Sequence, residues 1–350
     1  MHRNGASGTG GHGSMARPPA DRGSQDQAAT TCPYGLRYIR ESWQALVREA
    51  EGARAGDDPE HVHRMRVASR RLRAAMPVFK SCFPRKKYRL WQEEIKSITA
   101  SLGEARDLDV QVAFIGEYLG RHGYDCPEGG RPAPGACPTD IAALLRDLRQ
   151  KRRSVQPAVE AVAVSLGEGG ALHGFGMALA NPRPGTRGRD KPGKLARKAQ
   201  KTISSRAAGL LAYDPAVYDP DAVTRHHEMR IAAKRLRYTL EIFNRLSGGT
   251  LKTAIRRIRA IQDVLGQVHD CDVWIGYLPA FMPSQEPGPA RDPSIPVRDP
   301  AAIPVLLEDR ARERDRLYRV FVEMWDRLKD DRVFETLEEA VRHLPEMPGR

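Results

Sequence analysis

Apolar side chains recur every three or four residues from Leu36 onwards, within long stretches of Ala, Leu, Arg and Glu. A period of about 3.6 residues predicts amphipathic helices, and no segment has the strict alternation expected of a half-buried strand. Three segments rich in Pro and Gly interrupt the helical pattern, at 125–138, 181–193 and 283–300. The pattern therefore predicts an all-α fold with loops at these three places.

The beginning of the chain has a different composition. Residues 1–33 are rich in Gly, Ser and Pro and have almost no large apolar side chains. Such a segment cannot bury enough apolar surface to offset the entropy lost on ordering, so we expect a disordered tail. The helical domain is expected at about 34–346, with a first half at about 34–180, a linker at 181–193 and a second half at about 194–346.

The two halves share a repeated sequence, which predicts a duplicated pair of helices. Residues 63–73 (HRMRVASRRLR) return as residues 227–237 (HEMRIAAKRLR), and residues 102–110 (LGEARDLDV) return as residues 265–273 (LGQVHDCDV). Two matched blocks in the same order and at nearly the same spacing are hard to obtain by chance.

On a helix, the first block of each half separates into an apolar side and a basic side. Like charges three and four residues apart destabilise an isolated helix, and a merely solvated face has no reason to match in position between two copies. We therefore interpret the two basic sides, called here the basic stripes, as an anion-binding site. Their residues are His63, Arg66, Arg70 and Arg73 in the first half and His227, Arg230, Lys234 and Arg237 in the second.

The helix that follows each stripe carries a second basic line. Arg89 and Lys96 lie seven residues apart and so share one face, and their counterparts in the repeat, Lys252 and Arg259, are also basic. The planar guanidinium of Arg can donate two parallel hydrogen bonds to a phosphate, and Lys supplies a point charge. These four residues are secondary binding candidates.

Two pairs of carboxylates, Asp107 with Asp109 and Asp270 with Asp272, allow two interpretations. They could hold Mg²⁺ or perform acid–base chemistry. Alternatively, each pair follows a glycine that can end or kink a helix, and Asp is favoured in the first turn of a following helix. The structural interpretation is preferred, with Asp107 and Asp270 holding stripe arginines in place by ion pairs.

The histidines and cysteines give little support for a metal site. The helical neighbours of His63 and His227 are cations, which repel a divalent ion. We therefore expect these histidines to donate to phosphate or to a backbone carbonyl in the core, and expect no metal or other cofactor. The five cysteines are scattered, which favours a reduced, cytoplasmic setting. Cys126 and Cys137 have no nearby His and are interpreted as loop residues.

The charge balance points to a polyanionic partner. Lys and Arg number 57 against 44 Asp and Glu, which gives a net charge of +13, and such an excess attracts polyanions. Aromatic residues make up only 6% of the chain and no recognisable reader motif occurs, which disfavours nucleic acid. No apolar stretch approaches the roughly 20 residues that span a bilayer, so no membrane partner is expected.

The repeated blocks resemble the CHAD family, the conserved histidine α-helical domain. The resemblance rests on the two basic stripes and on the two Leu-Gly-x-x-[Arg/His]-Asp-x-Asp-Val blocks, and it extends from about Leu36 to about Leu344. It implies two helical bundles related by pseudo-twofold symmetry, with basic helices facing a shared groove. It also implies binding of inorganic polyphosphate, and often residence on polyphosphate granules in bacteria. One departure is Pro77, which stands where the second copy has Glu241 and should kink or shorten the first basic helix.

These observations together predict a non-catalytic polyphosphate-binding protein of the cytoplasm. Some CHAD relatives carry a fused triphosphatase domain with a Glu-x-Glu-x-Lys strand, and the chain has no such segment. Two alternatives stay open: a metal-dependent phosphohydrolase or phosphotransferase that uses the histidines and the Asp pairs, and a nucleic-acid binder. The sequence does not define the oligomeric state.

Overall fold

The computed structural model describes residues 30–124, 138–182, 193–282 and 302–344. Within these ranges every regular element is a helix, so the prediction of an all-α fold is confirmed. The first half contains α1 (Thr31–Arg48), α2 (Ala50–Ala55), α3 (Pro59–Val78), α4 (Arg85–Arg121), α5 (Thr139–Leu166) and α6 (His173–Ala180). The second half contains α7 (Lys194–Leu211), α8 (Val223–Phe243), α9 (Lys252–Tyr277), α10 (Ala302–Asp330) and α11 (Val333–Arg342). Within the same ranges, the short 3₁₀ helices η2 (Lys80–Cys82), η4 (Asp214–Tyr218) and η5 (Leu278–Phe281) lie between them.

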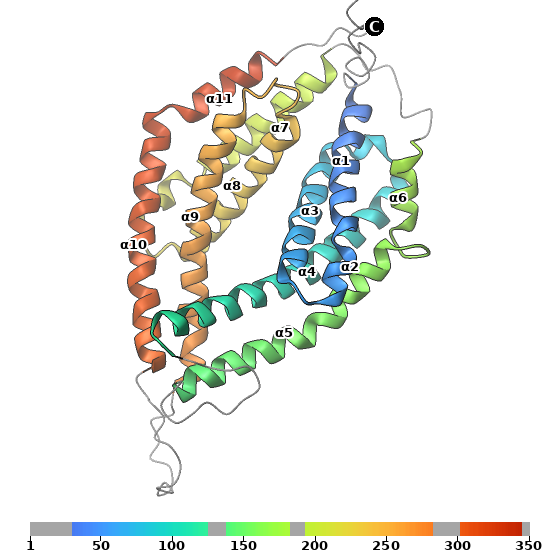
Figure 1. Cartoon of the computed structure of the whole chain (residues 1–350). Coiled ribbons are helices and arrows are strands. Elements are labelled where there is room, and N and C mark those ends of the chain that lie inside the picture. The colour runs from blue at the N-terminus through green and yellow to red at the C-terminus, as the bar shows by residue number, and fades with distance from the viewer. Residues whose placement is uncertain (1–29, 125–137, 183–192, 283–301, 345–350) are drawn as a thin grey trace, which may run out of the picture.

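The helices of each half pack in the same order. In the first half α1 packs on α3, α3 on α4, and α4 on α5; in the second half α7 packs on α8, α8 on α9, and α9 on α10. Figure 1 shows the second-half helices α7–α11 on the left and α1–α3 with α6 on the right, with α4 and α5 running below them towards the lower ends of α9 and α10.

The larger hydrophobic core joins the halves at the C-terminal ends of α3 and α8. Phe79 and Phe243, which correspond to each other in the repeat, are fully buried with ring centroids 6.2 Å apart. The Tyr34 hydroxyl donates a 2.6 Å hydrogen bond to the carbonyl of Ile242 and so ties α1 to the second half.

A second, separate core joins the halves at the far end of α4. Ile115 and Leu119 of α4 and Leu144 of α5 pack there with Trp274 of α9 and Leu306 of α10. The two halves are therefore held together at two hydrophobic contacts that lie at opposite ends of the long helix α4, whose 37 residues correspond to about 55 Å.

Three sequence-based expectations about helix boundaries require correction. Helix α1 begins at Thr31 and not after residue 33, because Thr31 and Tyr34 are buried and a proline is tolerated in the first turn. The glycines before the Asp pairs do not end a helix: α4 and α9 continue through them, since a helical glycine costs only about 1 kcal/mol and packing on both neighbouring helices outweighs it. Pro77 shortens α3 by only one residue relative to α8, because it lies in the last turn.

The expectation of reduced cysteines is wrong for two of them. Cys32 at the start of α1 and Cys82 in η2 form a disulfide, although 50 residues separate them in the sequence. The packing of α1 on η2 brings their Cα atoms to 5.3 Å, within the range that a disulfide requires. Cys271 is free and buried, and Cys126 and Cys137 lie outside the described residues.

Candidate functional site

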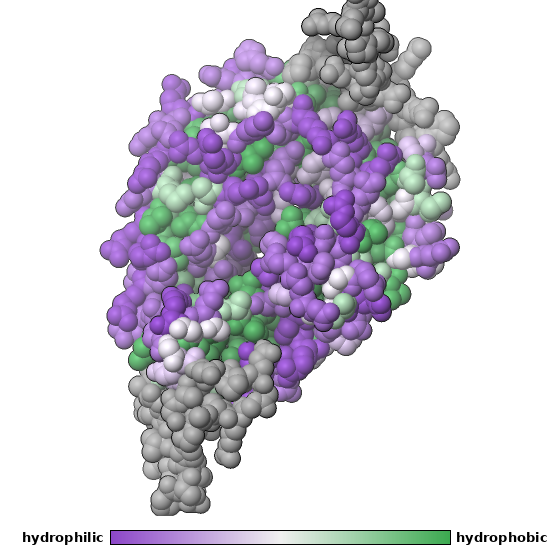
Figure 2. Space-filling view, in the orientation of Figure 1, coloured by the Kyte–Doolittle hydropathy of each residue, from purple (hydrophilic) through white to green (hydrophobic). Residues whose placement is uncertain are grey.

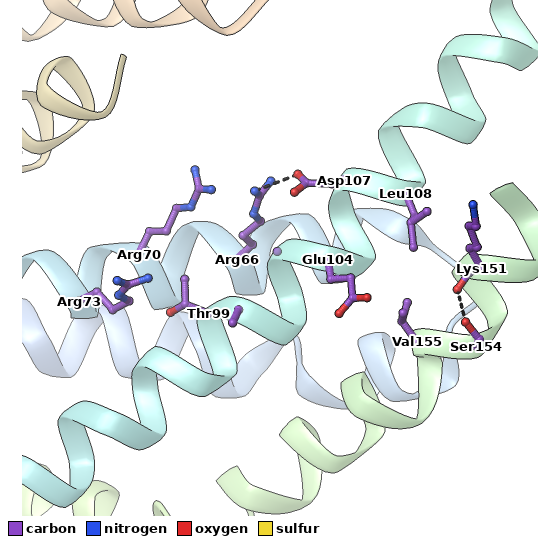
Figure 3. Close-up of a pocket in the computed structure, with 12 residues that line it drawn as sticks. Arg66, Arg70, Arg73, Thr99, Glu104, Asp107, Leu108, Lys151, Ser154 and Val155 are labelled. Carbon is purple, nitrogen blue, oxygen red and sulfur yellow. Dashed lines mark hydrogen bonds and ion pairs between the residues drawn. The ribbon is translucent and has the colours of Figure 1, made fainter. Parts of the chain in front are cut away.

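Helix α3 places the first basic stripe. Asp58 accepts a 2.8 Å hydrogen bond from the backbone amide of Glu60, and Pro59 occupies the first helical position, so the helix start is well defined. Met65 and Leu72 are fully buried, which turns the opposite side of α3, with Arg66, Arg70 and Arg73, away from the core. Figure 3 shows these three arginines projecting from α3.

The two stripes meet where α3 lies beside α8. Arg66 and Arg70 of α3 and Arg230 and Lys234 of α8 lie close enough for their charges to act on one another, and we call these four residues the central cluster. Burial, together with the charges of Arg70, Arg230 and Arg66, lowers the pKa of Lys234 to about 7. Burial is also the main cause that lowers the pKa of Arg66 and of Arg230. The cluster therefore gathers cations that are poorly solvated and repel one another.

Carboxylates neutralise the central cluster only in part. Arg66 Nη2 lies 3.0 Å from Asp107 Oδ1, and the pKa of Asp270, raised mainly by burial, is held back by the charge of Arg230. Arg70 and Lys234 have no ion pair or hydrogen bond to any described residue, and the Nε atoms of Arg66 and Arg230 are buried without a partner in the described part of the chain. The cluster keeps unused donors and excess positive charge, which suit it to an anion.

A pocket of about 710 Å³ extends the central cluster along the first half. We call it the first-half pocket. Arg66, Arg70 and Arg73 of α3 form one side, Asp107 lies with other residues of α4, and Lys151 of α5 stands at the far side (Figure 3). Lys151 was not singled out from the sequence, because it belongs to a helix without a matched block. Its amine pairs with Asp147 at 2.8 Å.

The last residue of the second stripe, Arg237, is hydrogen-bonded within the protein. Arg237 donates a 2.8 Å hydrogen bond from Nε to Gln262 and another of 2.8 Å from Nη1 to Glu241. Only 12% of its side chain is exposed. Glu241 also receives Arg259 at 3.5 Å and lies 3.7 Å from Arg71 Nε. Arg237 is thus a stripe residue whose charge is already matched within the protein.

The secondary candidates are placed differently in the two halves. Lys252 and Arg259 line a second pocket of about 630 Å³ between α1, α3, α8 and α9, here called the α1–α9 pocket. Arg89 and Lys96 are exposed on α4, and Lys96 pairs with Glu93 at 3.2 Å. Figure 2 shows that hydrophilic residues dominate this face of the molecule, with hydrophobic residues in smaller patches.

The stripe histidines lie beside cations. Burial and the charge of Arg106 lower the pKa of His63. Burial and the charges of Arg230 and Lys234 lower the pKa of His227, whose Nδ1 lies 3.3 Å from Nδ1 of His269. The sequence analysis did not single out His269. The repeat offered a signal for it, because His269 occupies the position that Arg106 occupies in the first copy.

The outer aspartates of the two pairs are engaged with arginines of neighbouring helices. Asp109 lies 2.5 Å from Arg152 Nε on α5, and Asp272 lies 3.0 Å from Arg314 Nε on α10. Arg314 is itself buried and also donates to the carbonyl of Pro220. These equivalent pairs link α4 to α5 and α9 to α10. No group of three or more His, Cys, Asp or Glu side chains suited to a metal ion occurs among the described residues.

The comparisons agree with this architecture. The model of the CHAD domain family matches residues 37–279, which is more than half of the chain. The chain therefore belongs to the CHAD domain family. No curated protein matches the sequence. None of the helices in the described ranges is long and apolar enough to cross a membrane.

Solved structures that share the fold include two with low sequence identity to this chain. The crystal structure of the CHAD domain from the plant Ricinus communis has 21% sequence identity and a TM-score of 0.54, and the match covers 96% of this chain and all of that one. PptA from Streptomyces chartreusis has 15% identity and a TM-score of 0.51, with 85% of this chain and 99% of that one covered. At these identities the likeness concerns the fold.

Proposed function

We propose that this protein binds inorganic polyphosphate through the central cluster and the first-half pocket, and that it does not hydrolyse it. The observation that carries the proposal is the meeting of two matched basic stripes, with Arg70 and Lys234 left without ion pairs among the described residues. Four cations repel one another there, and a bound polyanion would relieve that repulsion. Membership of the CHAD family selects polyphosphate among polyanions.

A linear polymer suits the site better than a single phosphate. The cations come from α3 and α8 and continue through Arg73 into the first-half pocket. A chain that contacts one stripe presents its next phosphates to the other at high effective concentration, because the second engagement is intramolecular. Triphosphate should therefore bind much more weakly than long polyphosphate.

The carboxylates favour a binding role over hydrolysis. Hydrolysis assisted by a metal would need free carboxylates to hold the ion, but Asp109 and Asp272 are engaged with Arg152 and Arg314. Asp107, paired with Arg66, orients a binding arginine. The Cys32–Cys82 disulfide removes the cysteine argument for a reduced cytoplasm, so residence on polyphosphate granules rests on the proposed binding alone, and a fluorescent fusion would test it.

The main test is a calorimetric titration with polyphosphate of defined lengths. If the stripe cations other than Arg237 all contact phosphates, the logarithm of the affinity should fall with the logarithm of salt concentration with a slope of roughly −3.5, using the coefficient for single strands. These cations are Arg66, Arg70, Arg73, Arg230 and Lys234. A slope near zero would mean that the stripes do not carry binding. Displacement by duplex or single-stranded nucleic acid at equal phosphate concentration would favour a nucleic-acid binder.

Two further measurements separate the alternatives. Incubation with polyphosphate and Mg²⁺ or Mn²⁺ should leave the chain length unchanged; shortening or released phosphate would establish a hydrolase or transferase. The triple variant Arg66→Ala, Arg70→Ala, Arg73→Ala should weaken binding of long chains far more than threefold. The matching variant Arg230→Ala, Lys234→Ala, Arg237→Ala should also exceed threefold. If both triple variants stay within threefold of the parent while retaining their helical circular dichroism, the ligand binds elsewhere.

A further inference from the structure

The two copies of the basic stripe differ in one position that changes the ligand site. The last stripe residue is Arg73 in α3 and Arg237 in α8, and the residue four positions later is Pro77 in α3 and Glu241 in α8. Residues four apart lie on the same face of a helix, so Glu241 can reach Arg237. Proline offers no such carboxylate to Arg73.

The side-chain contacts of Glu241 show the effect of this difference between Pro77 and Glu241. Glu241 is 13% exposed and is approached by Arg237 at 2.8 Å, by Arg259 at 3.5 Å and by Arg71 at 3.7 Å, so arginines of α8, α9 and α3 converge on one carboxylate. Gln262 takes a second hydrogen bond from Arg237. The repeat counterpart of Gln262 is Thr99, whose hydroxyl instead donates to the carbonyl of Ile95.

The matching end of α3 is open. Arg73 is exposed, lines the first-half pocket, and has no ion pair or hydrogen bond to any of the described residues. A phosphate that reaches Arg73 meets a free guanidinium, whereas a phosphate that reaches Arg237 must compete with an internal carboxylate and with Gln262.

We propose that Glu241 acts as an internal counter-ion that withdraws Arg237 from the ligand site, so that polyphosphate leaves the central cluster along α3 and Arg73 and not along α8. This inference rests on the proposed function. The bound polymer would then extend from the central cluster in one direction only, along α3 into the first-half pocket. It also separates the central cluster from the α1–α9 pocket, where Lys252 and Arg256 would otherwise continue the path.

The test removes the carboxylate from the second copy in one variant and adds a carboxylate to the first copy in another. Glu241→Gln keeps the shape of the side chain and removes the negative charge that neutralises Arg237. Long polyphosphate should therefore bind at least threefold more tightly, and the salt slope should steepen by about 0.7, one additional contact. Pro77→Glu places a carboxylate four residues after Arg73, so long polyphosphate should bind at least threefold more weakly. Triphosphate bound within the first-half pocket should be little affected by Glu241→Gln and weakened by Pro77→Glu.

Glu323→Gln is the matched control. Glu323 pairs with Arg327 at 3.0 Å on exposed α10, four residues apart, and lines neither pocket, so the variant removes the same charge and frees one arginine away from the site. Its affinity should stay within about twofold of the parent. Equal gains for Glu323→Gln and Glu241→Gln would overturn the inference, because a general effect of net charge would then explain both.

The outcomes separate the inference from the proposed function. Absence of polyphosphate binding by the parent protein defeats the proposed function. Binding by the parent with unchanged affinity in both Glu241→Gln and Pro77→Glu defeats only the role of Glu241. Circular dichroism and thermal unfolding establish that each variant is folded. If Glu241→Gln loses stability because Arg71 is released, Pro77→Glu decides alone, and unchanged binding by it refutes the inference.

Discussion

The Nδ1 atoms of His227 on α8 and His269 on α9 lie 3.3 Å apart, and the two rings are tilted by 52° with their centroids 4.4 Å apart. Burial and the charges of Arg230, His227 and Lys234 lower the pKa of His269 to about 4. The ring is therefore neutral near pH 7, so the second copy has an uncharged group where the first copy has Arg106. At this position the second half thus carries a positive charge only when the pH is low.

His269 should make the unliganded protein lose stability in acid. Its pKa in the folded state lies below the value of 6.5 in the unfolded chain, so the unfolded chain binds more protons between pH 4 and 6.5. The contribution of His269 is fully present above pH 6.5 and is lost as the pH falls through about 4. Urea denaturation at pH 5 and pH 7 should show a smaller pH dependence for His269→Asn than for the parent. Identical pH dependence would exclude His269 as the cause.

Lys234 should couple polyphosphate binding to proton uptake. Its pKa of about 7 means that it is largely neutral at pH 8 in the free protein, and a bound polyanion favours the charged form and raises the pKa. Binding at pH 8 should therefore take up close to one proton, and affinity should fall as the pH rises from 7 to 9. Calorimetry in two buffers of different ionisation enthalpy measures the uptake. Lys234→Arg, which stays charged, should abolish most of it; equal uptake by the two proteins would assign the proton to another group.

The pairs between helices should matter more for stability than the pairs on the surface. Asp272→Ala removes the closer carboxylate of Arg314, which is 8% exposed, and leaves it only Asp315 at 3.9 Å. Removing one partner of a buried pair costs about 3–5 kcal/mol. Asp331→Ala, which breaks the exposed pair with Arg257, should cost less than about 1 kcal/mol. Urea denaturation of both variants gives the comparison, and similar losses would mean that Arg314 finds another acceptor.

The disulfide should contribute substantially to stability. Closing a loop of 50 residues between Cys32 and Cys82 corresponds to about 4 kcal/mol in the chain-entropy model. Thermal unfolding of the parent should therefore occur at lower temperature with a reductant present. Cys82→Ser should show the lower melting temperature without reductant and should not respond to it. Cys82→Ser retains the other four cysteines, so a response of this variant to reductant would mean that a second disulfide contributes.

Most of the fold could be predicted from local patterns, because helices leave a periodic trace in the sequence. The matched blocks identified α3, α4, α8 and α9, since each block carries its own apolar face. The break expected at each glycine was wrong because propensity is a weak, local effect, and α4 is stabilised by packing on α3 and α5 along its length. The disulfide was missed because sequence separation says nothing about spatial distance.

The candidate site was predictable as a set of charges but not as a set of contacts. The repeat predicts Arg66 and Arg230 on equivalent faces, and in the structure they lie close enough for the charge of Arg230 to act on Arg66. It could not show that Arg237 is engaged with Gln262, because that residue lies on another helix. His269 could have been found from the sequence through its match to Arg106. Lys151 could not, because only the packing of α5 on α4 places it in the first-half pocket.

The two separate hydrophobic contacts between the halves have a thermodynamic consequence for recognition. One contact, at Phe79 and Phe243, would allow the halves to pivot about it, but the second, around Trp274, fixes their angle. The spacing between the stripes is then set during folding, so a polymer bound there as proposed would lose its own freedom but would not have to order the protein. Loosening the distant contact, for example by Trp274→Ala, should weaken binding through an unfavourable entropy change while every stripe residue remains in place.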